Sequence, residues 1–228
     1  MNKTALLYFS RSLQEEIKHK DLSPNQSKRQ NKRLIHYFQS HSRKTLQKTH
    51  LPIFEITENL QVGDSFGERL SNAIEGVFNL DYESVIVVGN DCLDLKSEDI
   101  IKTQSLLENQ NLVLGPDLRG GLYLIGIQKN SFFKDSFSQL KWQCKELQNT
   151  IEVFAQKNNL YFSVLKALND FNFGYCIQEY LKSKNNSNVW LTVLSIFQFH
   201  VFKFSNYKNL KYSPNLPSQL SLRGPPLF

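Results

Sequence analysis

The sequence predicts an α/β fold with a mostly parallel central sheet that is covered by helices on both faces. Along residues 4–128, segments with the apolar pattern of strands alternate with segments of helical pattern, which is typical of parallel sheets. Val85–Val88 is a continuous run of β-branched apolar residues, and such a run indicates a strand buried on both faces. Apolar residues make up 40% of the 228 residues, enough to fill a sizeable core.

The predicted elements follow the chain in order. Strands are expected over residues 4–10, 52–57, 84–89, 112–114 and 122–128. Helices are expected over 28–48, 67–78 and 97–109, the last because Ser97 and the two acids after it favour a helix start. Residues 10–30 are polar and predict an irregular segment with a turn at 23–25. Later patterns predict a helix over 144–156, a strand over 161–167 and a short helix over 175–184.

Two carboxylates follow the predicted buried strand. The strand stops at Gly89-Asn90, and Asp91 and Asp94 come next. Open α/β sheets bind ligands beyond the carboxyl ends of their strands. A divalent cation needs oxygen ligands, often one or two carboxylates together with substrate phosphates. We therefore expect a cation site here; the alternative is a helix cap within a solvated acidic loop.

The net charge of +6 is concentrated near the N-terminus. Residues 11–50 contain ten Lys or Arg against three Asp or Glu, a local charge of +7, so the remainder of the chain is close to neutral. A basic segment of this kind binds polyanions, lines a phosphate pocket or forms a solvated helix face. Few aromatic residues interleave it and no nucleic-acid-binding motif is present, so we expect no nucleic-acid partner. None of the five His has metal-ligand spacing.

The cysteines and apolar segments bear on location. Cys92, Cys144 and Cys176 show no CxxC spacing, which fits reduced thiols in a cytoplasmic protein; Cys92, inside the acidic loop, has the alternative of being a reactive thiol. The N-terminal apolar stretch is too short for a signal peptide. Residues 189–201 are apolar but shorter than the roughly 18–20 residues a transmembrane span needs. We expect a cytoplasmic protein without a transmembrane segment.

Composition divides the chain into residues 1–183, a single α/β domain, and residues 184–228, an apolar C-terminal extension. The Asn- and Ser-rich stretch 183–188 marks the boundary. Three roles for the extension stay open: packing on the domain, a homodimer contact, or contact with a membrane surface.

Five segments, in this order and spacing, resemble one family. They are QVGDSFGERL at 61–70, VVGNDCLDL at 87–95, LGP at 114–116, GGLYLIG at 120–126, and Trp142. The set resembles the bacterial GT-A-type glycosyltransferase family, formerly a domain of unknown function. That family is related to nucleotide-diphospho-sugar transferases and to the guanylyltransferases of cofactor biosynthesis. The resemblance covers about residues 4–175 and implies a Rossmann-like GT-A three-layer sandwich, with residues 1–183 as the transferase domain.

The resemblance also implies a set of site residues and a cofactor. Asp91 and Asp94 would hold Mg²⁺ or Mn²⁺, with Asp170 as a further acidic position. The nucleotide would be bound by Phe9, Ser10, Arg11, Lys18, Lys20, Gly63, Asp64, Arg69 and Asn90, with the two lysines facing phosphates. The substrate would be bound by Arg119, Gly120, Gly121 and Trp142, because a glycine turn lets a sugar approach the backbone closely.

The chain departs from the family pattern at several positions. Arg119 stands where the family has Asp, Leu93 where it has Pro, and Asn172 where it has a second Asp after Asp170. Residues 13–16, LQEE, replace the Gly and Pro of the first loop, so a cradle of backbone N–H groups for phosphate is not expected there.

The leading functional hypothesis is a metal-dependent glycosyltransferase with a nucleotide-diphospho-sugar donor and an unknown acceptor. Asp91 and Asp94 would act through the metal. Asp117 is the nearest candidate by position for the base that deprotonates the acceptor, with Asp170 next. One alternative is a nucleotidyltransferase that uses a nucleoside triphosphate. The other is a nucleotide-binding homologue without activity, which the inverted charge at Arg119 favours.

Overall fold

A computed structural model describes residues 3–23, 27–171 and 188–197. In this part of the chain a sheet of six strands has the order β2-β1-β3-β5-β4-β6. All described strands run in one direction except β5, which is antiparallel to both neighbours. The strands are β1 (Thr4–Phe9), β2 (Ile53–Ile56), β3 (Ser84–Val88), β4 (Leu112–Pro116), β5 (Leu122–Gln128) and β6 (Phe162–Val164). The predicted α/β fold with a mostly parallel sheet is confirmed.

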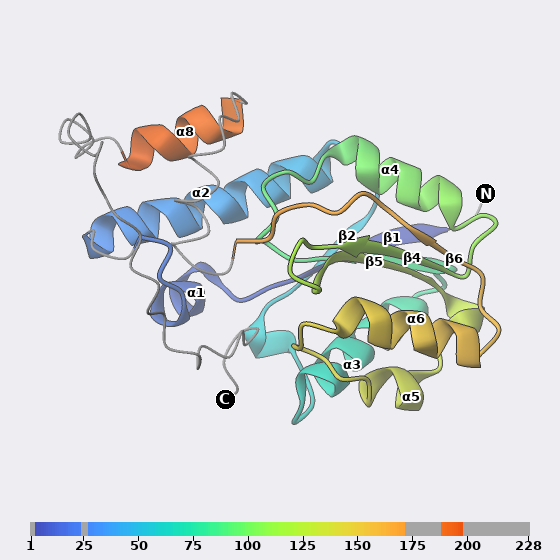
Figure 1. The fold of residues 1–228 in the computed structure, drawn as a ribbon. Coiled ribbons are helices and arrows are strands. Elements are labelled where there is room, and N and C mark those ends of the chain that lie inside the picture. The colour runs from blue at the N-terminus through green and yellow to red at the C-terminus, as the bar shows by residue number, and fades with distance from the viewer. Residues whose placement is uncertain (1–2, 24–26, 172–187, 198–228) are drawn as a thin grey trace, which may run out of the picture.

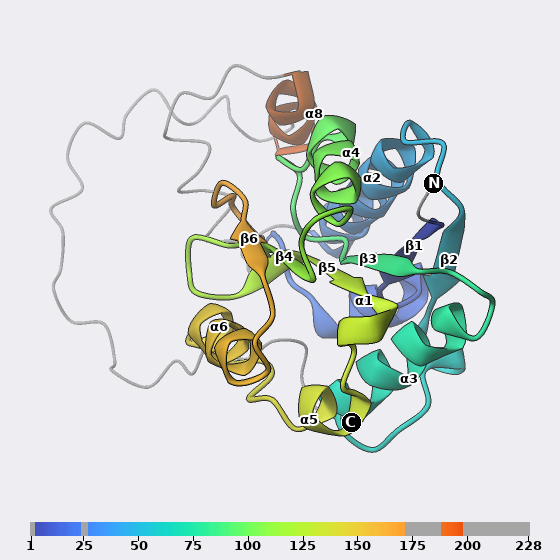
Figure 2. The same ribbon diagram turned by 90° about the vertical axis from the view of Figure 1, so that its right-hand side faces the viewer.

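Helices cover both faces of the sheet and give three layers (Figure 1). One face carries α3 (Phe66–Phe78), α5 (Lys134–Ser138) and α6 (Leu147–Lys157). The other carries α2 (Lys28–Gln47) and α4 (Ser97–Leu106), and α8 (Asn188–Phe197) lies outside α2 (Figure 2). The short helix α1 (Leu13–His19) lies beyond the sheet, at the end where β1 finishes. Single 3₁₀ turns, η1 (Glu58–Leu60) and η2 (Lys129–Ser131), complete the described elements.

The central strand β3 is buried on both faces, as its sequence predicts. Val85 and Val87 pack into the core between the sheet and helices α3 and α6. Ile86 and Val88 pack into the core between the sheet and α4. Side chains of a strand alternate between faces, so a strand with a core on each side must be apolar throughout. This double burial fixes the position from which the Gly89–Asp94 loop leaves the sheet.

The described part of the C-terminal segment packs on the domain. Val193 and Ile196 of α8 are buried against Leu34 and Phe38 of α2, and Phe171 belongs to the same apolar cluster. Of the three roles considered for the extension, packing on the domain is therefore the one observed for residues 188–197. No helix within the described ranges is long and apolar enough to cross a membrane.

Two helices differ from the sequence prediction. Residues 13–19 form α1, although an irregular segment was predicted there, and α5 was not predicted.

The cap of α4 is Lys96 rather than Ser97, because the side chain of Asp99 accepts the backbone N–H of Lys96 at 3.0 Å. The short helix predicted over 175–184 and the boundary at 183–184 lie outside the described residues.

Candidate functional site

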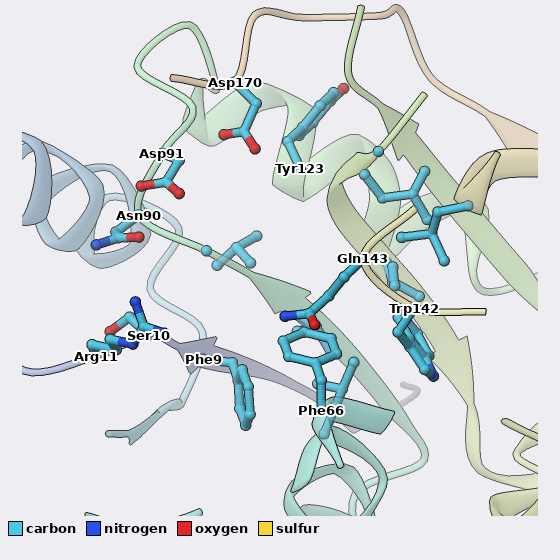
Figure 3. A pocket seen from close by; sticks show the side chains of 18 of the residues that line it. Phe9, Ser10, Arg11, Phe66, Asn90, Asp91, Tyr123, Trp142, Gln143 and Asp170 are labelled. Atoms are coloured by element: carbon cyan, nitrogen blue, oxygen red, sulfur yellow. The ribbon is translucent and has the colours of Figure 1, made fainter. Parts of the chain in front are cut away.

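A pocket of about 660 Å³ lies where β1 and β3 end. Figure 3 shows Phe9 to Arg11 from the end of β1, Asn90 and Asp91 after β3, and Tyr123 from β5 around one cavity. Because β5 is antiparallel to β3, its first residues lie beside the last residues of β3 and join the pocket wall. This is the edge at which open α/β sheets bind ligands.

The β1–α1 loop enters this pocket and is held by side chains from other elements. Gln61 donates from Nε2 to the carbonyl oxygen of Ser10 at 3.2 Å. Gln39, buried in α2, donates to the carbonyl oxygen of Arg11 at 3.0 Å. These bonds fix the loop without the glycine and proline that the family pattern has at this place.

Glu58 fixes the start of α1. Its two carboxylate oxygens accept the backbone N–H and the hydroxyl of Ser12, each at 2.6 Å. The Ser12 hydroxyl in turn accepts the N–H of Glu15 at 3.4 Å, so Ser12 is the N-cap of α1. This anchored helix carries Glu16, and Lys20 follows directly after it.

A buried charge cluster forms the floor of the pocket. The Lys20 ammonium is hydrogen-bonded to Asp91 Oδ1 and lies 3.5 Å from Glu16 Oε1. Arg11 Nη1 lies 4.0 Å from the other oxygen of Glu16. The side chains of Lys20 and Glu16 are only 7% and 8% exposed, against 21% for Asp91. Because buried charges are costly unless paired, these residues depend on one another.

The cluster shifts the protonation equilibria of its members. Burial works to lower the pKa of Lys20, but the carboxylates of Asp91 and Glu16 outweigh it, and the pKa is raised. Burial, followed by the negative charge of Asp91, raises the pKa of Glu16. Lys20 is therefore firmly held as an ammonium ion.

Backbone contacts hold both partners of the central ion pair. Asn31 of α2 donates from Nδ2 to the carbonyl oxygen of Lys20 at 2.7 Å, and its Oδ1 accepts the N–H of Leu22 at 2.8 Å. On the other side, the N–H of Phe171 donates to the carbonyl oxygen of Asp91 at 2.9 Å. This last bond brings Asp170 beside Asp91, as Figure 3 shows.

Only one of the two carboxylates predicted as the metal pair lines the pocket. Asp91 lines the pocket, whereas Asp94 does not. Within the described residues, no group of three or more His, Cys, Asp or Glu side chains is arranged to hold a metal ion. The Asp91 carboxylate already contacts an ammonium group. In this arrangement the donors do not fit a divalent cation, so no chemical step is assigned to one.

Asp117 has a structural task in the glycine turn. Its Oδ1 accepts the backbone N–H of Arg119 at 2.6 Å and of Gly121 at 2.9 Å. These two bonds engage Oδ1, so the predicted role of Asp117 as a base would rest on its other carboxylate oxygen. Asp117 lines the pocket, but this geometry favours a role in shaping the 117–121 turn.

The two glycines of that turn make room for protein atoms. A Cβ at Gly120 would lie 1.6 Å from the carbonyl oxygen of Lys145, and its φ is +91°. A Cβ at Gly121 would lie 2.5 Å from Asp117 Oδ2. The need for glycine at Gly120 therefore follows from the fold itself, because the clash is with backbone and φ is positive, whereas at Gly121 the near atom belongs to the Asp117 side chain. The resemblance implies close approach of a sugar at both.

Three aromatic side chains, those of Phe9, Phe66 and Trp142, also line the pocket. The Phe9 and Phe66 rings meet edge to face with centroids 5.8 Å apart, and Trp142 lies 5.6 Å from Phe66. The Trp142 indole N–H donates to the carbonyl oxygen of Phe137 at 3.0 Å, which anchors the ring. Next to it, Gln143 has a φ of +61°, an uncommon backbone conformation that clusters at ligand sites.

The pocket gathers most of the residues named from the sequence. It is lined by Phe9, Ser10, Arg11, Lys20, Gly63, Asp64, Arg69, Asn90, Asp91, Asp117, Arg119, Gly121, Trp142 and Asp170. Lys18, Asp94 and Gly120 are not among its lining residues, and Lys18 pairs instead with Glu15 on the exposed face of α1. Their functional roles all stay predictions.

Several lining residues were not singled out from the sequence as site residues: Glu16, Glu58, Gln61, Tyr123, Gln143 and Lys145. One signal was present, because Glu16 and Lys20 are four residues apart and face each other on a helix. That signal requires α1, which was not predicted.

Cys92 also lines the pocket, but it is buried and burial raises the pKa of its thiol, which favours the unreactive protonated form.

The fold is similar to that of a solved structure from Desulfovibrio desulfuricans G20, a protein named as a candidate nucleotide-diphospho-sugar transferase. The TM-score is 0.74 at 20% identity, and the likeness covers 87% of this chain and 99% of the other. A cytidylyltransferase from Leptospira borgpetersenii serovar Hardjo-bovis covers 93% of this chain and 100% of its own, at 12% identity. Its TM-score of 0.40 is too low to carry an argument.

No curated protein sequence matches the chain. A family model does match, over residues 24–144, which is more than half of the sequence. Its description is "Uncharacterized protein conserved in bacteria (DUF2064)". This agrees with the resemblance found from the motifs at 61–142, and the chain belongs to this family.

Proposed function

We propose that the pocket binds the nucleoside diphosphate of a nucleotide-sugar donor and that the chain transfers the sugar to an acceptor. The observation that carries this proposal is the position of the pocket. It lies at the carboxyl ends of β1 and β3 in a fold shared with a candidate nucleotide-diphospho-sugar transferase, and residues from the segments that carry the sequence resemblance line it.

Positive side chains would bind the diphosphate. Arg11 and Lys20 line the pocket at the end of β1, and Arg69 lines it from α3. Diphosphate release leaves negative charge on the departing group, and a cation already in place stabilises that charge as it develops. In this proposal Arg11 and Lys20 supply that stabilisation.

The sugar and the acceptor would contact Arg119, Gly121 and Trp142, which also line the pocket. A guanidinium binds carboxylate or phosphate groups with two parallel hydrogen bonds. The family pattern of the resemblance has Asp at the position of Arg119, so an acceptor that carries an anionic group fits this pocket better than a neutral one.

The same pocket would suit a nucleotidyltransferase or a nucleotide-binding homologue without activity, and one experiment separates the three. Thermal unfolding is measured with UDP- and GDP-sugars and with UTP, CTP and GTP, and the products are analysed. A ligand at 100 times its Kd adds about 2.7 kcal/mol of stability.

Sugar transfer with release of a nucleoside diphosphate supports the proposal. Release of pyrophosphate supports the nucleotidyltransferase. Binding without turnover supports the inactive homologue. No shift with any nucleotide contradicts all three.

A further inference from the structure

The Lys20 ammonium lies against Asp91, one of the carboxylates to which the family resemblance assigns a metal ion, whereas the resemblance has Lys20 facing phosphates. It contacts the carboxylate of Asp91, the first residue of the predicted metal pair, and lies 3.5 Å from Glu16. Asp170, the third predicted metal ligand, lies beside Asp91 in the same pocket (Figure 3). Thus one carboxylate expected to bind a metal ion, Asp91, and one that was not expected, Glu16, are arranged around the Lys20 ammonium.

A divalent ion and this ammonium group would compete for one carboxylate. Mg²⁺ bonds its oxygen ligands at about 2.0–2.1 Å and binds through one or two carboxylates. An ion on Asp91 would therefore lie next to the Lys20 ammonium, where the two positive charges repel each other. Lys20 has little freedom to move away, because its side chain is 7% exposed and Asn31 holds its carbonyl oxygen.

The ammonium keeps hydrogen-bonding capacity for a ligand. A lysine has three N–H donors, and Asp91 and Glu16 are its side-chain partners among the described residues. Arg11, 4.0 Å from Glu16, provides a second positive group on the same floor. These two side chains bring two positive charges, and the Glu16 carboxylate between them offsets one when it is ionised, so they supply part of the charge that a divalent ion would bring.

We infer that Lys20 replaces the divalent cation in this pocket, so that the chain binds its nucleotide without metal. The inference rests on the proposed function for the nucleotide but makes a separate statement about the cation. It also accounts for Glu16: where the family has glycine or proline in the first loop, this chain has a buried carboxylate that partners Lys20.

The first test compares nucleotide affinity with EDTA and with Mn²⁺, by calorimetry on the full chain with UDP and GDP. Equal affinity in both conditions is expected. Binding that requires Mn²⁺ would overturn the inference while leaving the proposed function intact. If neither nucleotide binds in either condition, the proposed function fails, and the cation is then judged by the second test alone.

The second test uses Mn²⁺ alone, followed by electron paramagnetic resonance. The wild type is expected to leave Mn²⁺ free, whereas Lys20→Met exposes Glu16, Asp91 and Asp170 to one another and gains a Mn²⁺ site. Lys20→Met should also lose about tenfold or more in metal-free nucleotide affinity, the equivalent of one charge-assisted hydrogen bond. Lys44→Met, an exposed lysine of α2 outside the pocket, should match the wild type in both measurements.

Circular dichroism shows whether Lys20→Met is folded. If it is not, the wild-type measurements still decide when they are made both without and with UDP or GDP. Mn²⁺ bound by the wild-type protein in either condition contradicts the inference, and its absence in both supports it. A folded Lys20→Met that binds neither more Mn²⁺ nor less nucleotide than the wild type also contradicts it.

Discussion

The backbone at Gly120 leaves no space for a side chain. The residue has a φ of +91°, and an added Cβ would fall on the carbonyl oxygen of Lys145. Gly120→Ala combines this clash with an unfavourable φ, so we expect a loss of about 2 kcal/mol or more in the free energy of unfolding. Urea denaturation measures the change.

Gly76 is a matched control on α3. It is exposed, and a Cβ there would meet no atom within 4 Å. Gly76→Ala should raise the free energy of unfolding by about 0.5–1 kcal/mol, because alanine is the better helix former. If Gly120→Ala were as stable as Gly76→Ala, the turn geometry described for residues 117–121 would be wrong.

At the scale of elements, α1 depends on a contact that is remote in sequence. Ser12 caps the helix and binds Glu58, which lies 46 residues away. Ser12→Ala removes the cap and leaves the Glu58 carboxylate without its hydroxyl partner, so we expect a loss of about 1–2 kcal/mol of stability. Because α1 positions Glu16 and Lys20, nucleotide affinity should fall as well. Calorimetry and urea denaturation on the same samples measure both effects.

Ser27→Ala separates the two effects. Ser27 caps α2 with the same kind of bond, from Gln30 N–H at 3.3 Å, but it is exposed and does not line the pocket. This variant should lose comparable stability and keep full nucleotide affinity. Equal affinity losses in both variants would show that α1 has no special part in binding.

These elements also show what a sequence can and cannot predict. The strand Val85–Val88 was predicted from a continuous β-branched apolar run, and the helix over 28–48, observed at 28–47, from an apolar stripe along one face. Helix α1 has only seven residues, and its anchor is Glu58. A short helix is marginal without tertiary contacts, and such contacts are invisible in a local pattern. The same reason hid Glu16 and its pairing with Lys20.

For the candidate site, most residues named from the sequence line one pocket, but their interactions with one another were not predicted. Asp91 and Lys20 are 71 residues apart, and only the fold shows that their charges meet. Asp94, three residues from Asp91, looked equivalent in the sequence but lies outside the pocket. Spacing along a loop does not determine which side chains turn toward a cavity.

At the scale of the whole molecule, the buried ion pair links stability to pH. The pKa of Lys20 is raised above its ordinary value of 10.5, so its contribution to stability is fully present below that value. The contribution is lost as pH rises through the raised pKa of the folded state, because the unfolded chain has already released the proton.

The alkaline range therefore tests this linkage. At about pH 8, Lys20→Met should be less stable than the wild type by about 3 kcal/mol or more, since it leaves buried carboxylates without a partner. The difference should shrink above about pH 10.5, where the ammonium begins to be lost from the unfolded chain. Urea denaturation across this range measures it, with Lys44→Met as the reference. A difference that stays constant with pH would contradict the assignment.

The bonds from Gln39, Gln61 and Glu58 to the β1–α1 loop determine when this loop loses its conformational freedom. Ordering the backbone of one residue costs about 1–2 kcal/mol in entropy. Residues 10–12 are ordered during folding, through these three side chains. A ligand that enters finds the loop already in place, and the cost of ordering it does not reduce affinity. Association at this loop should accordingly be fast, with no closing motion to limit its rate.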